Sequence, residues 1–356
     1  MSSSIPRHGG RCEFGGQPPK GGGTQVRTAW HRSGRRLKRK TAAVLAAALV
    51  LPLTALVLGG AVADAAPART APAGGFEEVF VDSSMGPIKV QIQWAARGGT
   101  AALYLLDGLR ARDDRNAWSF ETNALDQYRN DNLTLVMPVG GQSSFYSDWY
   151  SASNFNNQPV TYRWETFLTR ELPAYLATRG VSRTNNGVLG LSMGGSAALT
   201  LAAYHRDQFK FAGSLSGYLN VSAPGMREAL RVAMISAGRY NVDAMWGPPW
   251  NPAWLRNDPF VFAPELAGLS MYISAASGLP GEFDRPRTPI DYVNTGSAIG
   301  LEGLALLNTR AFQVRLSSLG IPATYSFPSN GTHSWPYWSS ELFKARGQIL
   351  DTLNAW

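Results

Sequence analysis

The sequence predicts an α/β domain in which a mostly parallel, doubly wound sheet carries helices on both faces. Two observations predict this fold class. Short, uninterrupted apolar runs alternate with segments of helical periodicity. One of these runs leads through a glycine-rich turn directly into a helix of small residues. Strands that alternate with helices are typical of a parallel sheet built from crossover connections.

Residues 1–65 are predicted to form an export signal. A basic cluster at 35–40 precedes an uncharged apolar run over 41–63, and Ala63-Asp64-Ala65 has the small-x-small pattern of a cleavage site. The run is long enough to span a bilayer as an uncleaved anchor, although Pro52 lies in its middle, and cleavage is the preferred interpretation. Both alternatives place the rest of the chain outside the cytoplasm, as a secreted or cell-envelope protein.

The positive charge of the chain belongs to this signal. Residues 1–65 hold ten of the 33 Lys and Arg residues and two of the 25 Asp and Glu residues, which leaves 23 of each sign in residues 66–356. A formally neutral mature chain argues against nucleic-acid binding through net charge. The one cysteine, Cys12, also lies in the signal, so disulfides, thiol catalysis and cysteine-ligated metals are excluded from the mature part. We expect no metal and no organic cofactor.

An Ala/Pro-rich linker is predicted at residues 66–75, and residues 76–356 are predicted to be one catalytic domain. Residues 76–94 alternate in hydropathy on either side of Met85-Gly86-Pro87, which predicts an antiparallel hairpin. Parallel strands buried on both faces are predicted at 101–106, 133–139, 187–191, 211–215, 269–274 and 323–327. Helices are predicted at 162–177, 196–205, 302–319 and 334–353.

The glycine-rich turn is a G-x-S-x-G motif formed by Gly190, Ser192 and Gly194. A strand before it and a helix after it make it the nucleophile elbow of the α/β-hydrolase fold, with Ser192 as the nucleophile. Glycine on both sides lets the strand and the helix come close enough to form so tight a turn. The alternative, an ordinary Gly/Ser-rich loop, is disfavoured by the strand and the helix.

A serine nucleophile needs a base, and the mature chain has only His205 and His333. We interpret His205 as structural because it lies in the helix after the elbow and cannot reach back to Ser192. His333 follows the last predicted strand, where this fold carries its histidine. The usual position of the acid, after strand 269–274, nominates Glu282 or Asp284. Glu302, predicted at the start of a later helix, is the other candidate.

The oxyanion hole is expected to combine the backbone N–H of Met193 with one from the loop 107–110. Asp107 and Arg110 on that loop could bind substrate hydroxyls or form a solvated ion pair. Three tryptophans after Tyr240 either cover the site or belong to the core: Trp246, Trp250 and Trp254.

Four motifs carry a resemblance to a known family: residues 105–110, 136–150, 190–193 and 330–335. The chain from about Val79 onward resembles the antigen 85 mycolyltransferases, and the fifteen-residue run from Val136 is very specific. The resemblance implies an acyltransferase that moves a mycoloyl group from trehalose monomycolate to a second trehalose monomycolate or to arabinogalactan. It also implies a monomer at a cell-envelope lipid surface. Family members bind fibronectin through a segment that overlaps residues 125–150.

Carried over by position, the resemblance implies Ser192 as nucleophile, His333 as base and Glu302 as acid, in a register supported by Phe312-Gln313. It also implies Leu109 and Met193 as oxyanion donors, and Asp107, Arg110 and Trp335 as trehalose ligands. There are four departures: residues 151–160 lack the family's cysteine pair, Ser274 replaces a cysteine, Glu121 replaces an asparagine that contacts trehalose, and Gly194 stands where several members have alanine, which leaves the elbow unharmed. A carboxylesterase with the same triad and a fibronectin-binding adhesin remain as alternative functions.

Overall fold

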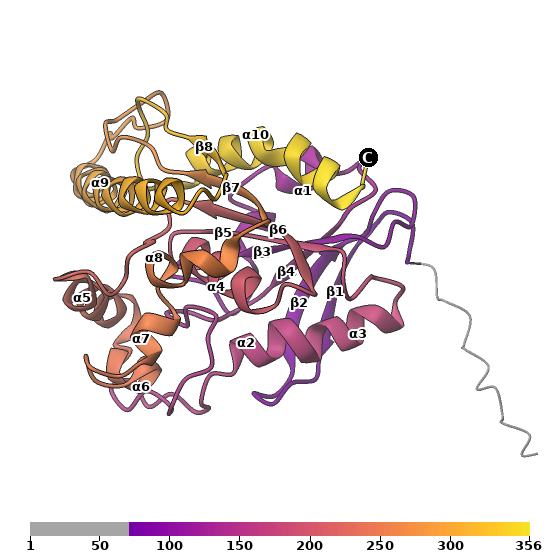
Figure 1. The fold of residues 1–356 in the computed structure, drawn as a ribbon, viewed down its shortest axis with the longest axis horizontal. Coiled ribbons are helices and arrows are strands. Elements are labelled where there is room, and N and C mark those ends of the chain that lie inside the picture. Colours follow the sequence, from indigo (N-terminus) through magenta and orange to yellow (C-terminus); the bar gives the residue numbers. More distant parts are fainter. Residues whose placement is uncertain (1–70) are drawn as a thin grey trace, which may run out of the picture. The chain divides into compact units, whose positions relative to one another are not determined.

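The computed structural model describes residues 71–356, so the predicted export signal lies outside the described residues. Its strands are β1 (Phe76–Val81), β2 (Ile88–Gln93), β3 (Ala102–Leu106), β4 (Thr134–Pro138), β5 (Asn186–Leu191), β6 (Phe209–Leu215), β7 (Ser270–Ser274) and β8 (Thr324–Ser326). They form one sheet in the order β1-β2-β4-β3-β5-β6-β7-β8. The β1–β2 and β2–β4 pairs are antiparallel and the other five pairs are parallel. The predicted mostly parallel α/β sheet is therefore confirmed (Figure 1).

The longer helices are α4 (Met193–Tyr204), α5 (Met226–Gly238), α9 (Pro289–Ser318) and α10 (Trp335–Leu353). The helix predicted at 162–177 is present as α2 (Trp164–Thr166), a π-helical turn (Phe167–Glu171) and α3 (Leu172–Thr178). Shorter elements are the 3₁₀ turns at Ala117–Ser119 and Ala263–Leu266, α1 (Ala124–Gln127), α6 (Val242–Trp246), α7 (Ala253–Arg256) and α8 (Pro259–Phe262). No helix within residues 71–356 is both long and apolar enough to cross a membrane.

Two apolar cores lie on the two faces of the sheet. The larger contains side chains of α2, α3, α4 and the second half of α9, and the smaller contains those of α1 and α10. Figure 1 shows α1 and α10 on one side of the sheet, and α2, α3 and α4 on the other. Because both faces are covered, the central strands β3, β4 and β5 are buried at every residue, which explains their continuous apolar runs.

The prediction for the helix at 302–319 was wrong at its start, because α9 begins at Pro289. Thr288 caps the helix: its side chain accepts a hydrogen bond from the Asp291 N–H, and the Asp291 carboxylate accepts one from the Thr288 N–H. No residue from 289 to 301 is buried, so the first part of α9 has none of the amphipathic periodicity from which the helix was predicted.

The predicted linker also ends earlier than expected. Ala71 is buried in the larger core, the Gly74 N–H donates to Ala95 O, and the Trp94 N–H donates to Gly75 O. Residues 71–75 therefore belong to the folded domain, next to the hairpin of β1 and β2.

Candidate active site

Ser192 lies between the end of β5 and the start of α4, in a backbone conformation with φ of 52° and ψ of −120°. Its N–H donates to Leu215 O at 2.8 Å, which fixes the turn to the end of β6. A Cβ on Gly190 would lie 2.4 Å from the backbone of Gly194, and a Cβ on Gly194 would lie 2.5 Å from Asp107 O. Neither position has room for a Cβ unless the backbone shifts, and the turn holds its serine in the strained conformation of a nucleophile elbow.

Two backbone N–H groups adjoin this serine. The loop that follows β3 comes so close that a Cβ on Gly108 would lie 3.7 Å from Ser192 Cβ. Within residues 71–356, neither the Leu109 N–H nor the Met193 N–H has a hydrogen-bond partner. Met193 is also the first residue of α4, where the helix dipole favours negative charge. The pair can therefore stabilise an oxyanion.

The fifteen-residue run from Val136 supports these two donors. The Ser143 N–H donates to Leu109 O at 3.0 Å, and the Phe145 N–H contacts Met193 Sδ at 3.2 Å. The Tyr146 hydroxyl accepts from the Asp107 N–H at 3.0 Å. Ser143, Phe145 and Tyr146 all have positive φ. The part of this motif that follows β4 thus forms a strained loop that contacts Asp107, Leu109 and Met193.

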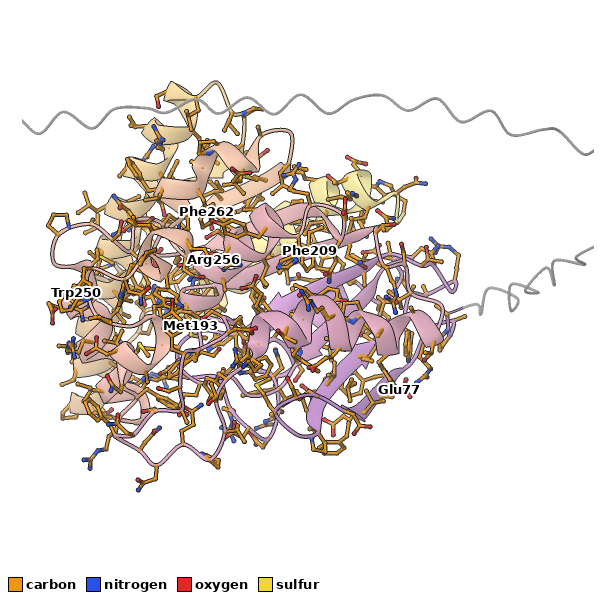
Figure 2. All side chains as sticks on the ribbon, turned by 60° about the horizontal axis from the view of Figure 1, so that its bottom comes forward. Glu77, Met193, Phe209, Trp250, Arg256 and Phe262 are labelled. Carbon is orange, nitrogen blue, oxygen red and sulfur yellow. The ribbon has the colours of Figure 1, made fainter. Side chains whose placement is uncertain are left out.

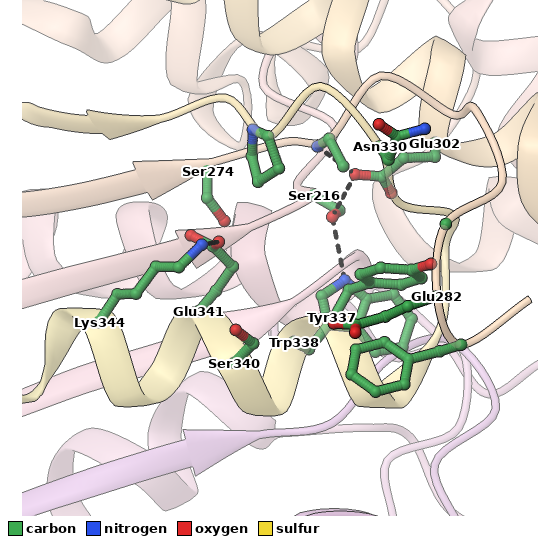
Figure 3. A pocket seen from close by; sticks show the side chains of 14 residues that line it. Ser216, Ser274, Glu282, Glu302, Asn330, Tyr337, Trp338, Ser340, Glu341 and Lys344 are labelled. Atoms are coloured by element: carbon green, nitrogen blue, oxygen red, sulfur yellow. Dashed lines mark hydrogen bonds and ion pairs between the residues drawn. The ribbon is translucent and has the colours of Figure 1, made fainter.

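His333 and Glu302 form a buried pair. The Nδ1 of His333 lies 2.8 Å from Glu302 Oε2, and the Glu302 side chain is 1% exposed. The other carboxylate oxygen, Oε1, accepts from Ser216 Oγ at 2.8 Å and from the Ala276 N–H at 2.7 Å (Figure 3). In the neutral tautomer in which Nδ1–H donates to Glu302, the Nε2 of His333 carries a lone pair and can act as a base.

The competing acid candidates lie elsewhere. Glu282 is exposed, and Asp284 accepts from Thr332 Oγ1 at 2.6 Å and from the Tyr337 hydroxyl at 2.5 Å. Asp284 therefore holds the loop that carries His333. Glu302 is the candidate that contacts His333, but it lies in the middle of α9 and not at a helix start, as the sequence had suggested.

Sequence reasoning missed three residues around this pair. The indole N–H of Trp338 donates to Ser216 Oγ at 2.9 Å, and Ser216 has a φ of 50°. The His333 ring lies between Trp338, at 4.8 Å and 90°, and Tyr218, at 6.1 Å and 28°. Trp338 lies about one helical turn after Trp335, so the spacing of the two tryptophans could have predicted that both side chains lie on the same face of the helix. Ser216 and Tyr218 follow a strand in an ordinary Gly/Ser-rich sequence and gave no comparable signal.

The comparisons with known proteins agree with this geometry. An esterase family model, described as "Putative esterase", matches residues 83–349. The diacylglycerol acyltransferase/mycolyltransferase Ag85C of Mycobacterium leprae is 42% identical over 336 residues, which are 93% of this chain and 97% of the relative. Ag85B of Mycolicibacterium smegmatis is 44% identical over 317 residues, which are 87% of this chain and 94% of the relative. This chain belongs to the antigen 85 mycolyltransferase family.

Solved structures place the family within the α/β-hydrolase fold. The crystal structure of Mycobacterium tuberculosis MPT51 (FbpC1) has a TM-score of 0.67 at 30% identity, over 79% of this chain and 100% of that one. The serine hydrolase FphF of Staphylococcus aureus has a TM-score of 0.57 at 14% identity, over 78% of this chain and 99% of that one. The second likeness concerns the fold alone. The expected fold and family are both confirmed.

The residues that the antigen 85 resemblance assigns to trehalose differ in accessibility. Asp107 is 1% exposed, and its carboxylate accepts from the Ala117 N–H at 3.0 Å. Burial raises the pKa of Asp107 to about 7, against the opposing effect of that hydrogen bond. The carboxylate is turned away from solvent, so its role as a sugar ligand stays a prediction that this geometry does not support.

Arg110 and Trp335 lie closer to the surface. Arg110 donates to Ser236 O at 3.3 Å and to Ser236 Oγ at 3.2 Å, which joins the oxyanion loop to α5. Trp335 is the first residue of α10 and meets Trp118 edge to face at 5.5 Å. Both remain in reach of a ligand at the site, because Arg110 is exposed and Trp335 is only half-buried.

The departures from the family pattern have different surroundings. Glu121 is exposed, and its N–H donates to Ala117 O. Ser274 is buried, and its hydroxyl has no hydrogen-bond partner among residues 71–356. Ser274 lines a cavity of about 330 Å³ that Glu302 and Ser216 also line (Figure 3).

The other aromatic and titratable candidates lie outside the site. Trp246 and Trp254 are core residues at 2% exposure, whereas Trp250 is 82% exposed at the margin of the molecule (Figure 2). His205 lies just past α4 and bonds Glu165 at 2.8 Å, in agreement with a structural role. Residues 71–356 contain no group of three His, Cys, Asp or Glu side chains that could hold a metal ion.

Proposed function

We propose that this chain is a secreted serine acyltransferase that moves a mycoloyl group from trehalose monomycolate to a second trehalose monomycolate or to cell-wall arabinogalactan. One observation carries the proposal: a chain homologous to mycolyltransferases over nearly their whole length keeps a serine elbow, two free N–H donors and a buried His–Glu pair. The product of each cycle is a mycolate ester on a new sugar.

In the proposed first half-reaction, His333 Nε2 takes the hydroxyl proton of Ser192 as Ser192 Oγ attacks the mycolate ester carbon. Glu302 orients the imidazole and stabilises the imidazolium that forms. The Leu109 and Met193 N–H groups hold the oxyanion, and each such donor is worth about 3–4 kcal/mol. His333 then returns the proton to trehalose, which leaves an acyl-enzyme on Ser192.

In the second half-reaction a sugar hydroxyl must outcompete water for the acyl group. Transfer prevails when the sugar is held next to the acyl carbon, because a bound nucleophile has a very high effective concentration. We propose Arg110 and Trp335 as the sugar contacts, since they flank the oxyanion loop and the histidine loop. Asp107 would then contribute mainly by fixing the oxyanion loop to Ala117.

The first part of α9 supports a lipid as the acyl donor. Ile290, Tyr292 and Val293 are 60%, 64% and 63% exposed, on the helix that also carries Glu302. The Ala298 carbonyl of the same segment accepts a hydrogen bond from the His333 N–H at 3.2 Å. An exposed apolar surface on the helix that carries Glu302 suits a long acyl chain at a cell-envelope lipid surface.

Adhesion to fibronectin has weaker support. The family segment corresponds to residues 125–150, which include the interior strand β4, and most of residues 131–149 are buried. A partner protein could reach only the ends of this segment in the folded chain. We therefore retain enzymatic transfer, by a monomer exported through residues 1–65, as the primary function.

Incubation with trehalose monomycolate and labelled free trehalose tests the proposal. Protein lacking residues 1–65 should incorporate the label into glycolipid, and the Ser192→Ala variant should not. Free mycolic acid without labelled glycolipid would instead indicate a carboxylesterase with the same triad, and Glu121 would be the first residue to examine. No reaction with either protein would overturn the acyltransferase assignment.

A further inference from the structure

Ser216 is a buried residue that the mechanism above does not use. It follows β6, is 3% exposed, and donates its N–H to Ser274 O at 2.7 Å, which fixes it to the end of β7. Its hydroxyl donates to Glu302 Oε1 at 2.8 Å (Figure 3), and Glu302 Oε2 faces His333 Nδ1. Any effect of this hydroxyl on the base therefore passes through the Glu302 carboxylate.

The direction of the Ser216 hydrogen bond is fixed. The indole N–H of Trp338 donates to Ser216 Oγ at 2.9 Å, and an indole N–H can only donate. Within residues 71–356, Glu302 Oε1 is the acceptor available to the proton of this hydroxyl. Ser216 is therefore a donor to Glu302 and not an acceptor from it.

Two donors meet on one oxygen of Glu302, because Oε1 also accepts from the Ala276 N–H at 2.7 Å. Hydrogen bonds donated to a carboxylate favour its ionised form and disperse its negative charge. A proton on Oε1 would displace one of the two donors, and a carboxylate with dispersed charge holds a neighbouring imidazolium less tightly. Both effects lower the affinity of the His333–Glu302 pair for an additional proton.

The titratable groups around this pair come from three other segments. They are Tyr218 after β6, Glu282 and Asp284 before α9, and Tyr337, Glu341 and Lys344 on α10. Glu341 and Lys344 form an ion pair at 2.6 Å, and burial raises the pKa of Tyr218, so its phenol stays neutral. Because replacement of Ser216 by alanine alters none of these groups, a comparison of the two proteins isolates the Ser216 hydroxyl.

We propose that Ser216 is a positioning residue that sets the pH range in which His333 acts as a base, through the hydrogen bond that it donates to Glu302. This inference rests on the Ser192–His333–Glu302 mechanism of the proposed function, but not on the identity of the acyl acceptor. Without the hydroxyl, the pair binds a proton more tightly. A larger fraction of the protein then carries a protonated pair at acidic pH, and this fraction cannot accept the proton of Ser192.

The test is the pH profile of kcat/KM for Ser216→Ala with a short soluble ester, measured from about pH 5 to about pH 9. We expect the midpoint of the acidic limb to rise by about one pH unit, because a hydrogen bond to a charged group is worth roughly tenfold in proton binding. The value of kcat/KM should therefore fall about tenfold at acidic pH and stay nearly unchanged on the alkaline plateau.

Two further variants separate this effect from stability. Ser214→Ala is the matched control, because Ser214 is fully buried on β6 and its hydroxyl has no hydrogen-bond partner among residues 71–356. Its pH profile should match that of the natural protein. Ser216→Gly also removes the hydroxyl, and glycine adopts the φ of 50° at this position without strain. This variant should unfold at a higher temperature than Ser216→Ala and show the same displaced midpoint.

An unchanged midpoint in both Ser216 variants, an equal loss of kcat/KM at every pH, or the same displacement in Ser214→Ala would overturn the role of Ser216. Failure of the triad itself would be recognised separately, since Ser192→Ala would then retain ester turnover. Failure of acyl transfer alone would appear as ester hydrolysis without labelled glycolipid and would leave the pH profiles of the Ser216 variants unaffected.

Discussion

The two carboxylate oxygens of Glu302 have different hydrogen-bond partners. This difference determines how the catalytic pair responds when one of the oxygens is replaced. Oε1 accepts from the Ala276 N–H, which can only donate, whereas Oε2 faces His333 Nδ1. Any replacement must therefore keep an acceptor at the Oε1 position. The side chain that replaces Glu302 decides which tautomer of His333 is present.

We predict that Glu302→Gln lowers kcat about a thousandfold or more. The glutamine carbonyl must face Ala276, which turns its NH₂ toward His333 Nδ1 and forces the proton onto Nε2. Nε2 then cannot accept the proton of Ser192. The measurement is ester turnover with Glu282→Gln as the control, and near-normal turnover of Glu302→Gln would show that Glu302 is not the acid.

Asp107 predicts a pH dependence of stability. Its pKa is raised to about 7 in the folded chain, so the folded state binds the proton more tightly than the unfolded state does. Its contribution is fully present below the unfolded pKa of about 4 and is lost as pH rises to about 7. The free energy of unfolding should fall by about 4 kcal/mol more in the natural protein than in Asp107→Asn between pH 4 and pH 8. Parallel profiles from denaturant unfolding would contradict the buried, neutral carboxyl.

At the residue scale, the sequence was informative where chemistry limits the options. Two histidines in the mature chain reduced the search for a base to His333, and a glycine-flanked serine indicated Ser192. The contacts of Asp107, Ser216 and Tyr218 could not be predicted, because each joins segments that are far apart in the sequence. No local sequence pattern predicts the hydrogen bond from the Ala117 N–H to Asp107 or the one from the Trp338 indole to Ser216.

At the scale of elements, the elbow depends on close backbone approaches at two glycines. At Gly190 the strand β5 meets the Gly194 backbone of α4, and at Gly194 the helix meets Asp107 O after β3, so neither position has room for a Cβ unless the backbone shifts. This need was visible in the sequence, because strand, turn and helix follow one another there. The first part of α9 could not be predicted from the sequence, since a helix segment without buried residues has no hydrophobic periodicity.

We predict that Gly190→Ala destabilises the domain by about 3 kcal/mol and abolishes ester turnover, because its Cβ would lie 2.4 Å from the Gly194 backbone. Gly347→Ala, on α10, has nothing within 4 Å and should stabilise by about 0.5–1 kcal/mol. Thermal unfolding and turnover of the two variants test this contrast. Equal effects would mean that the tight turn is not required.

The exposed part of α9 predicts a substrate-dependent phenotype. Val293→Gln should lower turnover of trehalose monomycolate severalfold, because it removes exposed apolar surface from the first part of α9, and should leave turnover of a short soluble ester unchanged. Val314→Gln is the control, because Val314 is 69% exposed on the second half of the same helix. Both variants should unfold like the natural protein. Equal turnover of the lipid by both variants would remove the support for a lipid-contacting role.

At the scale of the whole molecule, the order of strands and helices was predictable because each central strand is buried on both faces and reads as a continuous apolar run. The antiparallel pairing of β2 with β4 was not, since a strand's neighbours follow from the packing of the complete sheet. The partition of charge was also readable from the sequence alone, because it requires only a boundary at residue 65.

This distribution of charge predicts that removal of residues 1–65 lowers the isoelectric point of the protein. The whole chain has a pI of about 9.7, whereas residues 66–356 carry 23 charges of each sign. Protein recovered from outside the cell should focus near neutral pH if the signal is removed. A strongly basic form would instead show that residues 1–65 are retained as an anchor.

The indole of Trp338 lies edge-on to the His333 ring, with centroids 4.8 Å apart. An imidazolium at this distance takes up an electron from an excited indole, whereas a neutral imidazole does so poorly. The fluorescence of Trp338 should therefore be quenched whenever His333 is protonated. Stopped-flow fluorescence, with Trp338→Phe as the blank, could then follow proton transfer through the catalytic cycle with unlabelled lipid.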